Sequence, residues 1–324
     1  MGDFRLWDLL LHADCRPEAG TTPHPSPLTP ASEASSPPMS LSPALLARLR
    51  RLDRWLREGR GATRPGLTGR LRAPAAELVD HRPYQPGDDP RYLDWRLLAR
   101  LRRPFVRQGE ARSATQVAVA VDCSASMGFD RKLEVAAEVA VGIAYLALEG
   151  EARISLHLLG RPGPSVAMGR GRLHLGRVVA ALEEARAGGE VAVAEALYGC
   201  AAAWPPGAQV ILLSDLLEPV ERLAPLGDLA RRGHPVEVIQ LLGPADLAPA
   251  ATGPCRLVDA ESGGGREAVV DMAAVARYQA ALGRHQEAVA ALARRHRIGL
   301  VVGEVAEGAE QALLAYLRLP RGVR

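Results

Sequence analysis

Aromatic residues and lysine are scarce in this chain. Phe, Trp and Tyr make up 4% of its 324 residues although 48% of them are hydrophobic, so we expect a core built mainly from Ala, Val and Leu. Lys132 is the single lysine among 40 basic residues. Because Ala, Gly and Pro are abundant as well, we interpret this as a GC-rich coding bias, and the many arginines are then no sign of a special role for arginine.

Cysteine pairs and long apolar runs are absent as well. The four cysteines stand at positions 15, 123, 200 and 255, with no C-x-x-C pair or metal-ligand spacing. Without a recognisable secretory signal, this pattern predicts a reduced, cytoplasmic location. The best apolar run, residues 135–148, contains a glutamate and is shorter than the roughly 18 residues that a membrane span needs. We therefore predict a buried helix there and no membrane insertion.

The motifs of several enzyme classes are missing. No G-x-x-x-x-G-K-[ST] loop occurs, which argues against nucleotide binding. There is no G-x-S-x-G elbow, and the eight histidines are dispersed without an H-E-x-x-H pair. Ser124 would act as a nucleophile only with a base that the sequence does not identify. We predict a protein that is not an enzyme and has no catalytic residues.

Positive charge is concentrated in the N-terminal part. Between Ala44 and Arg112 there are 17 arginines and 8 acidic residues, although the whole chain has a formal net charge of +3. Such a segment either complements the acidic remainder of the chain, which we favour, or binds an anionic partner. Anion or nucleic-acid binding through this segment is therefore an alternative function. It predicts a steep salt dependence of binding, but few aromatics are arranged for base stacking.

Two N-terminal segments differ in composition from the rest. Residues 1–40 are predicted to be a disordered or mis-assigned extension, because residues 16–40 are rich in Pro, Ser and Thr with little to bury. Residues 41–112 begin with a helix that Ser42 and Pro43 open. The turn-rich sequence after this helix predicts a small N-terminal β-rich subdomain.

Residues 113–324 form the third segment, in which strands and helices alternate. Expected strands lie at 117–121, 153–159, 209–214, 236–242 and 298–302, and expected helices lie near 131–149, 174–186, 192–204, 219–232, 272–296 and 306–318. A short hairpin turned by glycines is expected within 255–272. The alternation predicts an α/β fold, with a mostly parallel sheet covered by helices on both faces.

Polar side chains follow two of these strands. The stretch "VAVAVDCSASM" places Asp122, Ser124 and Ser126 in a D-x-S-x-S pattern after an apolar strand, and "VILLSDLLEP" places Asp215 after another. Carboxyl ends of parallel strands meet at one edge of a sheet, where binding sites form. Carboxylate and hydroxyl oxygens suit a hard cation such as Mg²⁺, so these residues are candidate metal ligands. Alternatively, Asp122 and the serines cap the following helix and close a turn.

The order of these motifs resembles the von Willebrand factor A fold with its metal-ion-dependent adhesion site. Upstream, "RPYQPGDDPRYLDWRLLAR" resembles the signature R-x-Y-x-x-G-D-D-x-R-x-x-D-W-x-x-x-A-R of the bacterial domain of unknown function family numbered 58. The resemblance covers roughly residues 44–320 and implies a von Willebrand factor A-like fold. The matching signature residues are Arg82, Tyr84, Gly87, Asp88, Asp89, Arg91, Asp94, Trp95 and Arg100. We favour a salt-bridged scaffold for them, with partner binding as the alternative.

One position departs from the von Willebrand factor A pattern. A threonine in G-G-T-x-L completes the metal shell of that family, whereas "AGGEVAVAEAL" has Glu190 at this place. This carboxylate either ligates the cation directly or abolishes the site. With Glu190 included, the candidate metal ligands are Asp122, Ser124, Ser126, Glu190 and Asp215.

The resemblance also implies a function. Such proteins are commonly associated with MoxR-type AAA+ ATPases, so we expect a cytoplasmic adaptor whose protein partner supplies an acidic side chain to the bound cation. A third alternative, a metal-dependent hydrolase, would need an open metal position and a general base.

Overall fold

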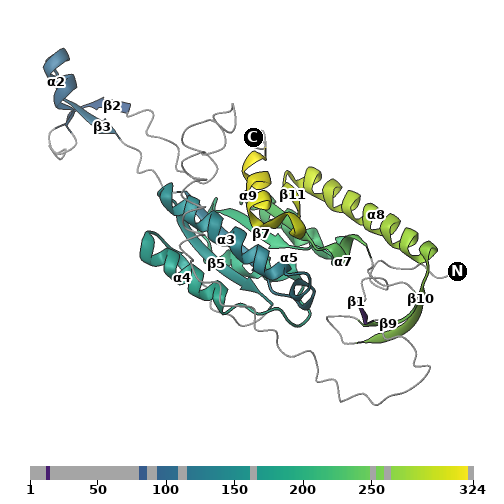
Figure 1. Cartoon of the computed structure of the whole chain (residues 1–324). Helices are drawn as coiled ribbons and strands as arrows, with labels where there is room; N and C mark the ends of the chain where they lie inside the picture. The colour runs from purple at the N-terminus through teal and green to yellow at the C-terminus, as the bar shows by residue number, and fades with distance from the viewer. Residues whose placement is uncertain are drawn as a thin grey trace.

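The computed structural model of the chain describes residues 12–14, 80–85, 93–108, 115–160, 166–248, 253–258 and 264–319. A six-stranded sheet with the order β11-β8-β7-β4-β5-β6 forms the centre of the larger part (Figure 1). Its strands are β4 (Gln116–Asp122), β5 (Arg153–Leu159), β6 (Val166–Gly169), β7 (Gln209–Ser214), β8 (Val236–Leu242) and β11 (Gly299–Glu304).

Five of the six strands run parallel, and β6 pairs with β5 in the antiparallel direction. The central strands β4, β7 and β8 are buried almost throughout. Their sequences are nearly continuous runs of Val, Ile, Leu and Ala, as expected for strands that are covered on both faces. The five predicted strands are present, while the edge strand β6 was not predicted.

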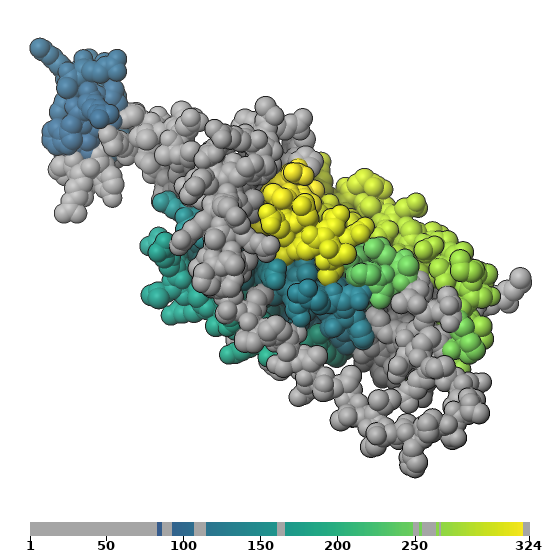
Figure 2. All heavy atoms as spheres, in the orientation of Figure 1, coloured from purple at the N-terminus to yellow at the C-terminus, as the bar shows by residue number. Residues whose placement is uncertain are grey.

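Helices cover both faces of this sheet. On one face lie α3 (Lys132–Glu149), α4 (Arg172–Glu183) and α9 (Gly308–Arg318), and on the other lie α5 (Val193–Cys200), α6 (Ala224–Arg231) and α8 (Met272–His296). Figure 2 shows α3 and α9 side by side on the outer surface. The predicted fold class, an α/β fold with a mostly parallel sheet and helices on both faces, is therefore confirmed.

Helix α3 is the most deeply buried of these helices. The sequence between Val135 and Ala147 is rich in Ala and Val, and most of its side chains are inaccessible to solvent. Small side chains let the helix approach both the sheet and its neighbours α4 and α9 closely. The buried helix predicted at 135–148 is thus confirmed, and no helix within the described residues is long and apolar enough to cross a membrane.

Short elements connect the main ones. The 3₁₀ helices are η3 (Ala125–Gly128), η4 (Ala201–Ala203), η5 (Val220–Leu223) and η6 (Val305–Glu307), and the one-turn helix α7 (Pro244–Leu247) follows β8. The predicted helices 192–204, 219–232 and 306–318 each contain one of these 3₁₀ turns, so their continuous α-helical parts are shorter than predicted.

A second, smaller sheet contains the predicted hairpin. Strands β9 (Gly253–Val258) and β10 (Gly265–Val270) pair antiparallel, which confirms it. The third strand, β1 (His12–Asp14), pairs with β9 and comes from the N-terminal extension. Three residues show no detectable period, so β1 was not predictable. Residues 16–40, predicted to be disordered, lie outside the described residues.

The N-terminal subdomain is described in part. Strands β2 (Asp80–Pro83) and β3 (Phe105–Gln108) form a two-stranded antiparallel sheet, and helix α2 (Trp95–Leu101) lies between them in the sequence. The predicted helix that begins at Ser42 lies outside the described residues. The predicted boundaries at residues 40 and 112 stay predictions.

Candidate functional site

The carboxyl ends of β4, β7 and β8 lie next to one another, because these three strands are parallel neighbours in the sheet. Asp122 is the last residue of β4, and Asp215 directly follows β7. Asp246 lies in α7, just beyond β8. All three carboxylates are buried. The sequence prediction that Asp122 and Asp215 lie at one sheet edge agrees with this arrangement, whereas Asp246 was not predicted.

Asp122 is held by hydrogen bonds on both carboxylate oxygens. Oδ1 accepts the backbone N–H of Ser124 at 2.8 Å, and Oδ2 accepts the hydroxyl of Ser214 at 2.7 Å. Burial, and to a smaller extent the negative charge of Asp215, raises the pKa of Asp122 to about 6 despite these hydrogen bonds. Asp122 is therefore harder to ionise than an exposed aspartate, and a positive charge close by would favour its ionised form.

Ser124 and Ser126 face each other. Their hydroxyls are hydrogen-bonded to each other with the Oγ atoms 3.0 Å apart, and Ser124 is buried while Ser126 is half-buried. Although Ser124 is the N-cap residue of η3, its side chain makes no capping hydrogen bond, and neither side chain caps α3, whose N-cap residue is Arg131. The alternative that these serines serve as helix caps is thus wrong, while Asp122 does close the turn through Ser124.

Lys132, the single lysine of the chain, is fully buried in this cluster. Its ammonium nitrogen lies 2.7 Å from Asp215 Oδ2 and 2.9 Å from Asp246 Oδ2. Burial on its own would lower the pKa of Lys132, but the two carboxylates more than offset this and raise it. For Asp246, burial outweighs the attraction of Lys132, so that its pKa is raised. We call Lys132, Asp215 and Asp246 the lysine hub.

Further hydrogen bonds hold the backbone and side chains of the two aspartates of the hub. Asp246 Oδ2 accepts the N–H of Gly243 at 2.8 Å, and Tyr278 Oη on α8 donates to the Asp246 carbonyl at 2.6 Å. The side-chain amide of Gln240 donates to the carbonyl of Asp215 at 2.8 Å. The lysine hub therefore joins the start of α3 to the loops after β7 and β8, and to the long helix α8.

The loops around the hub adopt unusual backbone conformations. Asp130, Arg131 and Leu216 have positive φ angles of 53°, 63° and 48° although none is glycine. The Asp130 carboxylate accepts the N–H of Ala245 at 2.7 Å, which ties the loop before α3 to α7. Left-handed conformations of non-glycine residues are unfavourable and persist where surrounding contacts hold them. The packed hub provides such contacts.

Glu190 lies close to this edge through its backbone, but its side chain pairs elsewhere. Ala125 N–H donates to the carbonyl of Gly189 at 3.0 Å, so the two loops are joined. The Glu190 carboxylate, however, is 57% exposed and forms an ion pair with Arg222 at 3.1 Å. Among the described residues, no three His, Cys, Asp or Glu side chains gather as a metal-binding group. The predicted ligand roles of Glu190 and Asp215 stay predictions, and each has a cationic protein partner.

The signature residues of the N-terminal subdomain have different environments. Asp94 is buried and caps α2, its Oδ1 accepting the N–H groups of Arg96 at 2.9 Å and Leu97 at 3.1 Å. The predicted salt-bridged scaffold stays a prediction. Trp95, by contrast, is 65% exposed, and Arg100 is exposed in the last turn of α2.

The other signature residues are described less completely. The backbone of Arg82 pairs with Val106 in the two-stranded sheet, and the N–H of Tyr84 donates to the carbonyl of Pro104. Gly87, Asp88, Asp89 and Arg91 lie outside the described residues.

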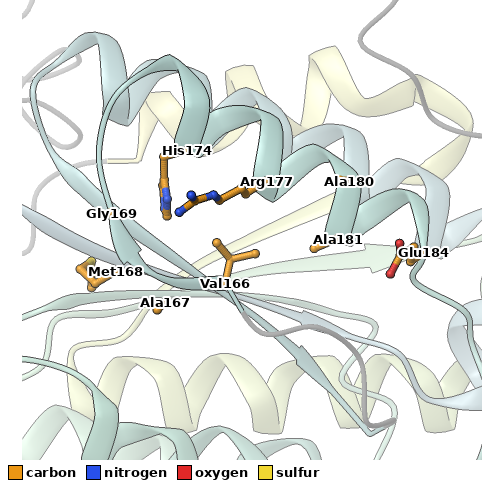
Figure 3. A pocket seen from close by; sticks show the side chains of 9 residues that line it. All are labelled: Val166, Ala167, Met168, Gly169, His174, Arg177, Ala180, Ala181 and Glu184. Atoms are coloured by element: carbon orange, nitrogen blue, oxygen red, sulfur yellow. The ribbon is translucent and has the colours of Figure 1, made fainter.

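A separate hollow of about 430 Å³ lies between β6 and α4 (Figure 3). Its lining includes His174 and Arg177 on α4 and Glu184, the residue that directly follows this helix. One ring nitrogen of His174 is within 2.8 Å of the carbonyl of Ile154, which makes this histidine a packing residue. None of the predicted site residues lines the hollow, and we assign it no role.

The sequence comparisons point to one family. A family model described as "Protein of unknown function DUF58" matches residues 80–288. The chain is 32% identical over 257 residues to the uncharacterized proteins Mb1516 of Mycobacterium bovis and Rv1480 of Mycobacterium tuberculosis, which covers 76% of this chain and 81% of each relative.

Among solved structures, the chain is similar to a von Willebrand factor type A protein from Catenulispora acidiphila, with a TM-score of 0.38, 14% identity and coverage of 64% of this chain and 43% of that one. It is also similar to the conserved hypothetical protein BatB from Bacteroides thetaiotaomicron, with a TM-score of 0.34, 14% identity and coverage of 61% and 96%. The family resemblance predicted from the sequence is confirmed: this chain belongs to the DUF58 family.

Proposed function

We propose that this chain is a protein-interaction module that binds its partner at the carboxyl edge of the main sheet through a divalent cation. Asp122, Ser124 and Ser126 hold the cation, and a carboxylate of the partner completes its coordination. Mg²⁺ is the candidate ion, because the donors are one carboxylate and two hydroxyls.

The distance between the two serine hydroxyls carries this proposal. Two adjacent ligands of an octahedral Mg²⁺ ion, each about 2.1 Å from the metal, lie about 3.0 Å apart. The Oγ atoms of Ser124 and Ser126 are 3.0 Å apart, and neither has a capping role. The hydroxyl pair thus has the spacing of two adjacent ligands of such an ion.

The formal charge of the site supports the same proposal. Asp122, Asp215 and Asp246 supply three negative charges, and Lys132 supplies one positive charge. All four side chains are buried. A divalent cation would balance the remaining charge, and buried charges are tolerated only when compensated.

A MoxR-type AAA+ ATPase is the proposed partner, because the family resemblance implies it. The cytoplasmic location predicted from the sequence belongs to the same proposal, since such a partner consumes ATP. The partner's exposed Asp or Glu would replace a water ligand of the cation. The interaction would then require the ion and the hydroxyl pair together.

The test measures binding between the purified full-length chain and a purified MoxR-type ATPase from the same organism. Biolayer interferometry in Mg²⁺ and in EDTA would compare wild type, Ser124→Ala/Ser126→Ala and Glu190→Gln. We expect binding of wild type and Glu190→Gln in Mg²⁺ only, and no binding of the double variant. Equal binding in Mg²⁺ and EDTA would contradict the cation bridge, and loss of binding in Glu190→Gln would restore Glu190 as a ligand.

A further inference from the structure

The lysine hub uses the carboxylate that the resemblance assigns to the metal. Asp215 Oδ2 accepts the Lys132 ammonium at 2.7 Å, and Asp215 Oδ1 accepts the N–H of Leu217 at 3.3 Å. Both oxygens of Asp122 also accept hydrogen bonds, from Ser124 and Ser214, but these donors are uncharged, whereas Asp215 is paired with an ammonium. Lys132 itself is fully buried, so its ammonium stays beside the two carboxylates.

An ammonium and a divalent cation do not share one carboxylate favourably. Their repulsion is stronger in a protein site than in water, because the effective dielectric constant is lower, and the double charge of the ion doubles it. A cation that approached Asp215 would meet the ammonium of Lys132 at contact distance. The divalent cation can therefore bind beside Asp122 and the hydroxyls of Ser124 and Ser126, which the lysine hub does not use.

We infer that Lys132 is a built-in counter-ion that reserves Asp215 for the lysine hub and restricts the divalent cation to Asp122, Ser124 and Ser126. This inference rests on the proposed function and assigns Lys132 a role that neither the motif nor the family description contains. Lys132 is then a specificity-determining residue, since it sets how many carboxylates the cation meets.

Weak cation binding by the free protein follows from this arrangement. Cation affinity in oxygen sites rises with the number of charged ligands. With Asp215 withheld, the chain supplies one carboxylate, and the ammonium adds a repulsive charge nearby. The partner's carboxylate is then the second charged ligand, so cation and partner bind cooperatively, and each increases the affinity of the other.

Two charge-matched double variants of the full-length chain test the inference. Lys132→Met/Asp246→Asn frees Asp215, whereas Lys132→Met/Asp215→Asn removes Asp215 as a ligand. Both variants remove one positive and one negative charge from the hub. Mn²⁺ serves as a paramagnetic substitute for Mg²⁺, and electron paramagnetic resonance counts the free ion directly in a titration without partner.

We expect Lys132→Met/Asp246→Asn to bind Mn²⁺ roughly tenfold more tightly than wild type, because a second carboxylate joins the cation. Lys132→Met/Asp215→Asn should stay within about threefold of wild type, because it loses no ligand. Asp122→Asn serves as the variant that loses the carboxylate ligand and should bind at least about tenfold more weakly.

Two outcomes would overturn the inference. In the first, Lys132→Met/Asp215→Asn binds Mn²⁺ as weakly as Asp122→Asn does. In the second, Lys132→Met/Asp246→Asn binds Mn²⁺ no more tightly than wild type does. If wild type binds no Mn²⁺ but Lys132→Met/Asp246→Asn does, Lys132 does withhold Asp215 from the cation, as inferred, whereas the cation site of the proposed function at Asp122, Ser124 and Ser126 fails. If no variant binds Mn²⁺, both the proposed function and the inference fail.

Circular dichroism verifies folding, and the neutral triple variant Lys132→Met/Asp215→Asn/Asp246→Asn replaces any double variant that unfolds. If this triple variant binds Mn²⁺ with the affinity of wild type, the inference is supported. If its Mn²⁺ affinity falls as far as that of Asp122→Asn, the inference is overturned.

Discussion

Replacing Lys132 with methionine is expected to destabilise the protein severely. The change leaves Asp215 and Asp246 buried without their shared ammonium, which lies 2.7 Å and 2.9 Å from them. Removing one partner of a buried ion pair typically costs about 3–5 kcal/mol. Against a total stability of about 5–15 kcal/mol for a domain, this is a large part of the free energy of unfolding.

The cost should depend on pH in a defined direction. Without Lys132, the pKa of an uncompensated buried carboxyl in the folded variant lies above its unfolded value of about 4. The folded variant then binds more protons than the unfolded chain, so its relative stability rises as the pH falls. The difference in unfolding free energy between wild type and Lys132→Met should accordingly be smaller at pH 5.5 than at pH 8.

Urea-induced unfolding, followed by far-ultraviolet circular dichroism at both pH values, measures this difference. Arg222→Met is the matched control, because it removes the partner of Glu190 in an ion pair whose side chains are 48% and 57% exposed. Exposed pairs contribute at most about 1 kcal/mol. If Lys132→Met costs no more than Arg222→Met, the buried charges of the lysine hub do not stabilise the fold.

Three further predictions concern other buried positions. His157 accepts a hydrogen bond from the Trp204 indole at 2.8 Å, and burial lowers the pKa of His157. Wild type should therefore lose stability relative to His157→Gln as the pH falls below about 6.5, by at most about 1.4 kcal/mol per pH unit. Urea titrations at several pH values measure this difference. Burial, followed by the charge of Asp122, raises the pKa of Cys123 to about 12, so Cys123→Ser should leave the reaction of the native protein with a thiol reagent such as DTNB unchanged at pH 8. If wild type reacts with DTNB faster than Cys123→Ser does, this prediction is contradicted. Gly160 has φ of +101°, and an added Cβ would clash with the side chain of Val191. Gly160→Ala should lower stability by about 1–3 kcal/mol or more, and an unchanged melting temperature would refute this prediction.

The main sheet could be predicted because its strands and helices carry strong local patterns. The apolar run of β4, followed by Asp122, marked both a buried strand and its polar end. The edge strand β6 was missed because its four residues, Val166–Gly169, are only partly buried and lack such a run. Local patterns thus identified the elements that form the core, and failed at the edge of the sheet, where pairing rather than burial defines the strand.

The pairing of charges could not be predicted in the same way. Lys132 is 83 residues from Asp215 and 114 from Asp246 in the sequence, so only the folded chain shows that they meet. The rarity of lysine was interpreted as coding bias, yet the single lysine occupies a site where a neutral residue would leave buried carboxylates uncompensated. The ion pair of Glu190 could not be predicted for the same reason. The loop of Glu190 lies near the predicted sheet edge, but its pairing with Arg222 depends on how η5 packs in the folded chain.

The lysine hub and the hydroxyl pair lie at one sheet edge but have opposite requirements: the hub needs a rigid, closed structure, and the hydroxyl pair needs access to an external ligand. The hub pairs both of its carboxylates with one buried ammonium and holds strained loops at Asp130 and Leu216, so it favours rigidity. The hydroxyls of Ser124 and Ser126 have no capping role and gain most from an external ligand. A rigid base lowers the entropic cost of binding, because the ligand groups are already positioned before the partner arrives. Rigidity supplied by Lys132 and ligation by the serines are therefore separable functions, and a variant that keeps the first while losing the second should fold normally and lose only its partner.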